Sequence, residues 1–116
     1  MNIQNALAAA AKKYKSKTGI IFGNNRISFE EVRTKSLKLA NVLKTCGIKK
    51  GDKVAICLPN SPEYIFSYLA CFCLGAVSVP LDFMLKEDEL ISCLDHSESR
   101  LLIAAFRQDV DFTAVM

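Results

Sequence analysis

The order of apolar and polar positions divides the chain into alternating helices and strands. An alanine-rich segment, residues 3–15, carries apolar residues at helical spacing and is predicted to form a helix. Residues 19–23 (GIIFG) read as a strand, and Asn24 and Asn25 suit the positive φ angles of a tight turn into a second strand. The chain is therefore expected to begin with a helix and a β-hairpin.

A long amphipathic helix is predicted after the hairpin. Ser28 and Glu31 have the spacing of a capping box, in which each side chain bonds the backbone N–H of the other residue. Gly47 is the expected stop of this helix, and Ile48 is placed to fold back onto its last turn. Apolar and small residues share one face of the helix: Phe29, Val32, Ser36, Leu39, Ala40, Leu43 and Cys46.

The segment 53–82 reads as a strand, a loop, a helix and a second strand. Residues 54–58 (VAICL) are apolar on both faces, as in a central parallel strand that helices cover. Ser61 is expected to cap the next helix, residues 63–74, which is apolar nearly all round and is therefore expected to be buried on more than one side. Residues 77–79 form a short second strand.

An amphipathic helix over residues 87–94 and an apolar strand over residues 101–105 follow. Right-handed crossovers make the last three strands parallel. The predicted fold class is α/β: a short N-terminal helix and β-hairpin, then a βαβαβ parallel sheet with helices on both faces. Residues 107–116 read as the start of another helix without a stop signal, so we expect residues 1–116 to be a single truncated unit.

Composition and charge narrow the possible partners. Hydrophobic residues make up 51% of the 116-residue chain, which indicates a face that something else normally covers. The net charge of +3 is too small to indicate nucleic acid. The nearest basic cluster lies at the end of the first predicted helix, where cations complement the helix dipole. Its members are Lys12, Lys13, Lys15 and Lys17.

No segment predicts a membrane span or an export signal. Residues 64–79 are the most apolar stretch, but Gly75 interrupts them and they fall short of about 20 residues. The N-terminus lacks the basic region of a signal peptide, so a cytoplasmic location is expected. The odd number of cysteines then argues against disulfides, and each thiol is expected to pack as a small apolar group rather than to bind metal. The five are Cys46, Cys57, Cys71, Cys73 and Cys93.

Two side chains are candidate ligand contacts. Residues 59–63 (PNSPE) follow a strand and precede a helix, at the carboxyl edge where open α/β sheets bind ligands. Pro62 removes an N–H donor and Glu63 adds a negative charge, so a structural loop is favoured over an anion site, with Asn60 as the remaining candidate. Asp82 follows the next strand at the same edge and either caps a turn or faces a cleft.

Other possible sites have simpler interpretations. Residues 47–53 (GIKKGDK) follow a helix and precede a strand, the reverse of a phosphate loop, and are expected to be a helix stop and a turn. His96 lies just past the predicted helix 87–94, where an imidazole complements the dipole. We therefore predict no catalytic residue, no metal ligand and no cofactor in this chain.

Taken together, these segments resemble the N-terminal portion of the adenylate-forming superfamily of acyl-CoA synthetases, peptide-synthetase adenylation domains and luciferases. Residues 27–32 (ISFEEV) are similar to its first core motif, and residues 74–82 (LGAVSVPLD) to its second. Residues 47–56 and 58–63 match the stretch between them. Phe29 and Cys73 depart from the usual Tyr and Lys, and Lys86 stands where a capping Ser or Thr is common.

The resemblance implies a ligase of fatty-acid-type metabolism that uses ATP, Mg²⁺ and CoA. A carboxylate attacks ATP to give an acyl-adenylate, and a thiol then takes the acyl group. The family's phosphate loop, Thr-Glu motif, ribose-binding Asp and mobile Lys lie downstream, so this chain alone is expected to be inactive and to need the remainder of the synthetase as partner. Within the family, the second motif and the acidic helix after it favour acyl-CoA synthetases over amino-acid adenylation domains.

Two alternatives remain open. The same segment occurs in enzymes that load a carrier protein, and 116 residues can also fold as a stand-alone α/β binding or interaction module. The isolated chain is further expected to self-associate, because an all-round apolar helix and open sheet edges would be exposed.

Overall fold

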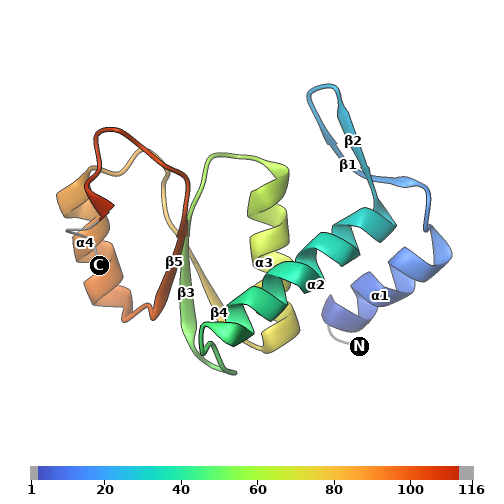
Figure 1. Ribbon diagram of the computed structural model, residues 1–116, viewed down its shortest axis with the longest axis horizontal. Helices are drawn as coiled ribbons and strands as arrows, with labels where there is room; N and C mark the ends of the chain where they lie inside the picture. The colour runs from blue at the N-terminus through green and yellow to red at the C-terminus, as the bar shows by residue number, and fades with distance from the viewer. Residues whose placement is uncertain (1–2, 113–116) are drawn as a thin grey trace.

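The computed structural model describes residues 3–112 and confirms the predicted order of elements (Figure 1). An N-terminal helix, a two-stranded antiparallel hairpin and a long helix come first, and a three-stranded parallel sheet with two more helices follows. The elements are α1 (Ile3–Lys13), β1 (Thr18–Phe22), β2 (Asn25–Ser28), α2 (Phe29–Thr45), β3 (Lys53–Cys57), α3 (Pro62–Leu74), β4 (Val77–Pro80), α4 (Glu87–Ser97) and β5 (Leu101–Ala104).

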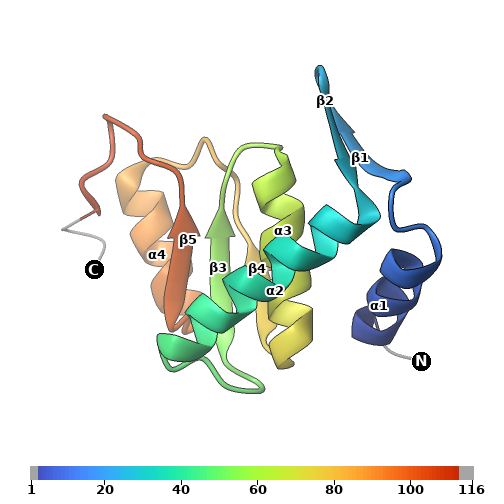
Figure 2. The same cartoon turned by 45° about the vertical axis from the view of Figure 1, so that its right-hand side comes forward.

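The hairpin projects away from the parallel sheet (Figures 1 and 2). Its turn corrects one prediction: Gly23 adopts the positive φ, +59°, whereas Asn25 is already the first residue of β2 and pairs with Phe22. Glycine has no Cβ and adopts this conformation without a steric penalty. The residue of positive φ in the turn is therefore Gly23 and not an asparagine.

Both ends of α2 are fixed by local hydrogen bonds. Glu31 N–H donates to Ser28 Oγ at 3.2 Å, which is one of the two bonds of the predicted capping box; the Glu31 carboxylate instead lies 4.0 Å from Lys35 Nζ. At the other end Gly47 has φ +92°, and Ile48 N–H donates to Leu43 O at 3.1 Å. Ile48 is buried, so the predicted stop of this helix is confirmed.

The parallel sheet has the order β4-β3-β5, with β3 in the centre. Helices α2 and α3 lie on one face and α4 on the other, as Figure 2 shows. Four of the five residues of β3 are buried, as predicted for a central strand covered on both sides.

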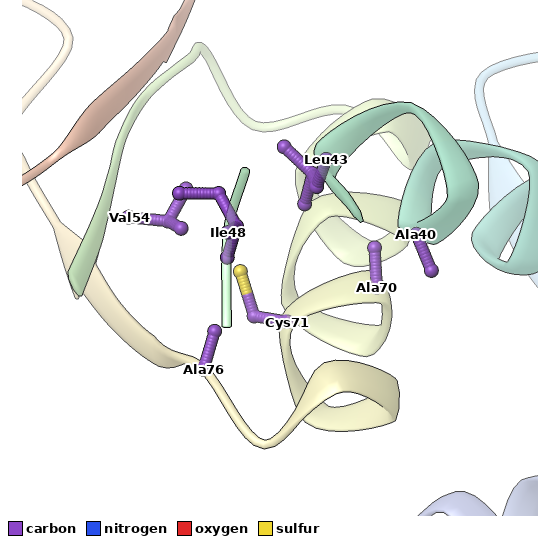
Figure 3. Close-up of a cluster of buried hydrophobic side chains, with 7 residues drawn as sticks. All are labelled: Ala40, Leu43, Ile48, Val54, Ala70, Cys71 and Ala76. Atoms are coloured by element: carbon purple, nitrogen blue, oxygen red, sulfur yellow. The ribbon is translucent and has the colours of Figure 1, made fainter. Parts of the chain in front are cut away.

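Each face of the sheet has its own apolar cluster. The first lies between β3, α2 and α3 (Figure 3). Its buried members are Ala40, Leu43, Ile48, Val54, Ala70, Cys71 and Ala76. The second lies under α4, where Leu90 packs with Cys57 and Val110. Adjacent residues of β5 divide between them, with Ile103 against the first cluster and Leu102 against the second.

Helix α3 packs against α2, α1 and the sheet, which confirms burial on more than one side. It still leaves Ile65 and Phe72 exposed, at 41% and 37% of their surface. Within residues 3–112 no helix is both long enough and apolar enough to cross a bilayer.

The C-terminal part departs from the predicted boundaries. Helix α4 continues to Ser97, so His96 lies in its last turn and not beyond it. Lys86 precedes α4, and its N–H donates to Glu89 Oε1 at 3.0 Å. Residues 107–111 are not helical, which corrects the start of the predicted helix, whereas Phe112 is helical. Residues 113–116 of that prediction lie outside the described part of the chain.

Candidate functional site

Two loops meet at the carboxyl edge of the parallel sheet. One joins β3 to α3 and the other joins β4 to α4, and parallel strands end at the same edge (Figure 2). Residues of both loops line an open hollow of about 430 Å³. The lining residues are Leu58, Pro59, Asn60, Tyr64, Pro80, Leu81, Asp82 and Phe83. The structure therefore brings together the two candidates from the sequence, Asn60 and Asp82.

Asp82 makes three hydrogen bonds, two within its own loop and one with the end of β3. Its Oδ1 accepts from Met84 N–H at 2.9 Å, and its backbone carbonyl accepts from Leu85 N–H at 3.2 Å and from Cys57 Sγ at 3.6 Å. The side chain thus forms a turn and also lines the hollow. Asn60 is exposed on the facing loop.

The loop before α3 is built differently from the prediction. Ser61 Oγ donates to Pro59 O at 2.9 Å and does not cap the helix. Pro62 occupies the first turn as expected, and the exposed Glu63 adds a negative charge there. Because a missing donor and a carboxylate both weaken the attraction of a helix N-terminus for anions, this end of α3 is a poor phosphate site.

Tyr64 closes one side of the hollow. Partial burial, together with the neighbouring Tyr68, raises the pKa of its phenol above the usual value, so the hydroxyl stays protonated at neutral pH. The two tyrosine rings lie 5.3 Å apart between centroids, one helical turn from each other. The hollow therefore offers a neutral phenol, a carboxamide and one carboxylate.

Arg107 was missed by the sequence analysis, although it follows β5 at the same edge. Its Nη1 donates to the carbonyls of Phe83 at 2.6 Å and Leu85 at 2.7 Å, and its guanidinium carbon lies 5.4 Å from the centroid of the Phe83 ring. Nη2 pairs with Asp109 Oδ2 at 2.8 Å. Arg107 thus fastens the loop after β5 to the loop after β4. The only signal in the sequence was its place after a predicted strand.

The Cys57 thiol lies beneath the same loops. Burial raises its pKa, and the nearby Arg107 offsets that rise only in part. A thiol of raised pKa is a poor nucleophile, so Cys57 is a packing residue with a weak hydrogen bond to the Asp82 carbonyl.

Other residues from the sequence analysis lie elsewhere. Helix α4 runs antiparallel to the strands, so His96, in its last exposed turn, lies at the opposite edge of the sheet from the hollow. Cys46 is exposed at the end of α2, which corrects the expectation that every cysteine is packed; all five thiols are free. Among residues 3–112 no three His, Cys, Asp or Glu side chains are grouped so as to hold a metal ion.

The family is established by comparison with known proteins. Residues 7–115 match the family described as AMP-binding enzyme. The match covers nearly the whole chain, and the chain therefore belongs to this family.

Curated relatives with similar sequences are CoA ligases. The chain is 37% identical over 100 residues to a 2-succinylbenzoate–CoA ligase of Bacillus velezensis, covering 85% of this chain and 20% of the relative. It is 35% identical over 88 residues to a long-chain-fatty-acid–CoA ligase of Bacillus subtilis, covering 76% of this chain and 16% of the relative. The chain thus spans no more than about a fifth of the length of these enzymes.

Solved structures of similar fold are also adenylation domains and acid ligases. The N-terminal subdomain of NpsA from Klebsiella oxytoca, in complex with anthranilyl-AMSN, superposes with a TM-score of 0.85 at 27% identity, covering 95% of this chain and 29% of that one. A mutant form of Coronafacic Acid Ligase from Pectobacterium brasiliense has a TM-score of 0.85 at 34% identity, covering 90% and 21%. The chain therefore has the fold of part of an adenylate-forming N-terminal subdomain.

Proposed function

We propose that this chain is the N-terminal scaffold segment of an acyl-CoA-synthetase-like ligase and is inactive alone. The complete ligase would convert a carboxylic acid to an acyl-adenylate with ATP and then to a CoA thioester, in the cytoplasm. The similarity to CoA ligases over 76–85% of this chain, but only 16–20% of theirs, supports this proposal. Those relatives are named for different acids and do not point to one acid substrate.

The residues at the carboxyl edge support a scaffold role over a site for ATP or Mg²⁺. Pro62 and Glu63 oppose phosphate at the start of α3, and the described residues have no cluster of metal-binding side chains. Asp82, the carboxylate of the hollow, is tied to Met84 N–H. A scaffold role, in which both loops hold their shape for the rest of the enzyme, fits these contacts.

CoA is preferred here to a carrier protein as acyl acceptor. The curated relatives that match 76–85% of the chain at 35–37% identity are named as CoA ligases, which supports this preference.

ATP–pyrophosphate exchange measured on the 116-residue chain tests the claim of inactivity. We expect exchange indistinguishable from buffer with a panel of acids, because the described residues offer no phosphate or magnesium site. Exchange above background that disappears in Asp82→Asn would overturn the claim and place activity in the hollow.

A calorimetric titration separates the scaffold from a stand-alone binding module. Its ligands are ATP, CoA and an acyl-adenylate analogue. Absence of heat supports the scaffold, and a dissociation constant of about 1–100 µM for any of them supports the module. The two apolar clusters support independent folding of the chain, which makes the titration practicable.

A further inference from the structure

Two open hollows adjoin at the start of α3 and form one groove. The first is the hollow of about 430 Å³ between the loops at the carboxyl edge, and the second, of about 280 Å³, lies between the hairpin and α3. Asn60 and Tyr64 line both hollows, so the two adjoin there. Figures 1 and 2 show the hairpin on the α3 side of the parallel sheet. The residues that line the two hollows are called the hairpin–edge groove below.

The hairpin end of the groove is apolar. Ile21 and Phe22 of β1 and Ile65 of α3 line the second hollow, and they are 63%, 46% and 41% exposed. No charged side chain is among the described residues that line this hollow. Bulky apolar side chains that gather around one hollow mark a binding surface, whereas single scattered ones do not. This end of the groove therefore fits a bulky apolar side chain.

The other end of the groove is polar and carries a negative charge. Asp82 is the only charged residue among the described residues that line either hollow. Its Oδ1 accepts from Met84 N–H, and no Lys, Arg or His of residues 3–112 forms an ion pair with it. Arg107, on the loop after β5, is already bound to Asp109 and to two carbonyls. This end of the groove therefore lacks a cation, although the chain has a net charge of +3.

We propose that the hairpin–edge groove binds an extended segment from the remainder of the ligase. The segment places a bulky apolar side chain at the hairpin end and a Lys or Arg beside Asp82, which supplies the charge that the groove lacks. The neutral hydroxyl of Tyr64 and the carboxamide of Asn60 lie between the two ends and can bond the backbone of the segment. This inference rests on the proposed function, in which the complete enzyme is about five times longer than the matched segment.

The shape of the groove favours a chain segment over a small ligand. Sites for small molecules are concave and bury most of the ligand. Here both hollows are open, and the groove runs from β1 across the start of α3 to the loop after β4. A small molecule would stay exposed on its outer side, whereas a segment of a folded enzyme brings its own covering layer.

A peptide array followed by an NMR titration tests the groove. The probes are overlapping peptides of the Bacillus velezensis 2-succinylbenzoate–CoA ligase, taken from outside the segment that matches this chain. We expect the 116-residue chain to bind peptides in which a bulky apolar residue lies near a Lys or Arg, with a dissociation constant of about 0.1–1 mM. The amide signals of residues 20–22, of the start of α3 and of Asp82 should shift, and those of α4 should not.

Matched variants examine the two ends of the groove separately. Asp82→Asn keeps the acceptor for Met84 N–H and removes the charge, and Ile21→Thr keeps the β-branched shape and removes apolar surface. Each variant is expected to weaken binding of the selected peptide by about threefold or more. The controls, Asp88→Asn and Val42→Thr, change an exposed carboxylate and an exposed apolar side chain that line neither hollow, and they should bind as the wild type does.

Several results would overturn the proposal. One is the absence of binding by every peptide up to about 1 mM, and another is binding that neither groove variant weakens. Shifts of the same amide signals on dilution of the chain alone would show a second copy in the groove instead. Shifts with ATP, CoA or an acyl-adenylate analogue would show a small ligand there. The peptide titration contains no ATP, so its failure is distinct from a failure of the proposed function, which the exchange assay measures.

Discussion

Glu98 ends α4 in a backbone conformation that glycine normally takes. Among residues 3–112 it is the only non-glycine residue with positive φ, at +56°. Its N–H donates to Asp95 O and the next N–H, of Ser99, donates to Leu94 O, each at 3.3 Å. These hydrogen bonds are typical of a helix that ends in a left-handed residue. Because Glu98 has a Cβ, this left-handed conformation carries a steric cost that glycine would not have.

Glu98→Gly is therefore expected to stabilise the chain. Removing the Cβ relieves about 1 kcal/mol of backbone strain, part of which the greater freedom of glycine in the unfolded chain offsets. Urea unfolding measures the change as a higher midpoint. Glu98→Ala is the control, because it removes the same charge and keeps the Cβ. Equal midpoints for the two variants would show that charge, and not backbone strain, is responsible.

Arg107 and Arg100 make a matched pair of arginines with different surroundings. The Arg107 side chain is 11% exposed and bonds two backbone carbonyls, whereas Arg100 is 62% exposed and lies 3.4 Å from Asp52 Oδ2. Arg107→Ala is expected to lower the free energy of unfolding by about 2–3 kcal/mol, because it removes two charge-assisted hydrogen bonds. Arg100→Ala is expected to cost about 0.5 kcal/mol or less, as exposed ion pairs usually do.

Chemical denaturation of both variants, with Arg107→Lys as a third, checks this prediction. A lysine keeps the charge but cannot present the planar fork of the guanidinium, so it should recover only part of the loss. If Arg107→Ala were no more costly than Arg100→Ala, the contacts of Arg107 would not hold the two loops together.

The helices differ in how their first turns are secured, although Ser28 and Ser61 look alike in sequence. Ser28 Oγ accepts from Glu31 N–H, whereas Ser61 Oγ donates to a carbonyl of its own loop. Ser28→Ala is therefore expected to cost about 1 kcal/mol, because an N–H of the first turn of α2 loses its acceptor. Ser61→Ala should cost clearly less. Thermal unfolding of the two variants compares them directly, and equal losses would mean that Ser61 also acts as a cap.

The elements themselves were predictable because their signals are local. The stripe of α2, the stop at Gly47 and the apolar run of β3 each lie within a few residues of sequence. The structure confirms all three, except that Cys46 of the predicted stripe is exposed. Helix α4 was predicted too short because Asp95, His96 and Ser97 add no apolar face, although they continue the backbone hydrogen bonds.

The contacts at the carboxyl edge were only partly predictable. Parallel topology was enough to place Asn60 and Asp82 at one edge, and they do line one hollow. Arg107 could not be found in this way, because the carbonyls that it bonds are 24 and 22 residues away in sequence. Whether the Ser61 hydroxyl caps α3 or donates a hydrogen bond to its own loop likewise depends on the loop geometry, which the spacing of residues in the sequence does not determine.

The whole molecule is a sheet with a core on each face and exposed apolar residues around it. Ile21 and Phe22 of the hairpin are 63% and 46% exposed, Val77 of β4 is 45% exposed, and Phe106 after β5 is 81% exposed. Relatives of this family are about five times longer than the matched segment. A scaffold segment that the rest of a ligase covers accounts for this distribution, and so predicts that the segment can be exchanged between ligases.

A chimaera of the Bacillus velezensis 2-succinylbenzoate–CoA ligase tests the exchange. Its matching segment, 100 aligned residues at 37% identity, is replaced by the corresponding residues of this chain. If the segment is scaffold, the chimaera should form its usual thioester with kcat/KM within about tenfold of the parent and with the same acid preference. A second chimaera with Arg107→Ala should unfold at a lower temperature, because the loops at the carboxyl edge are released. A folded chimaera with a changed acid preference would instead place substrate selection within this segment, and the hollow between Asn60 and Asp82 would then be the first place to look for it.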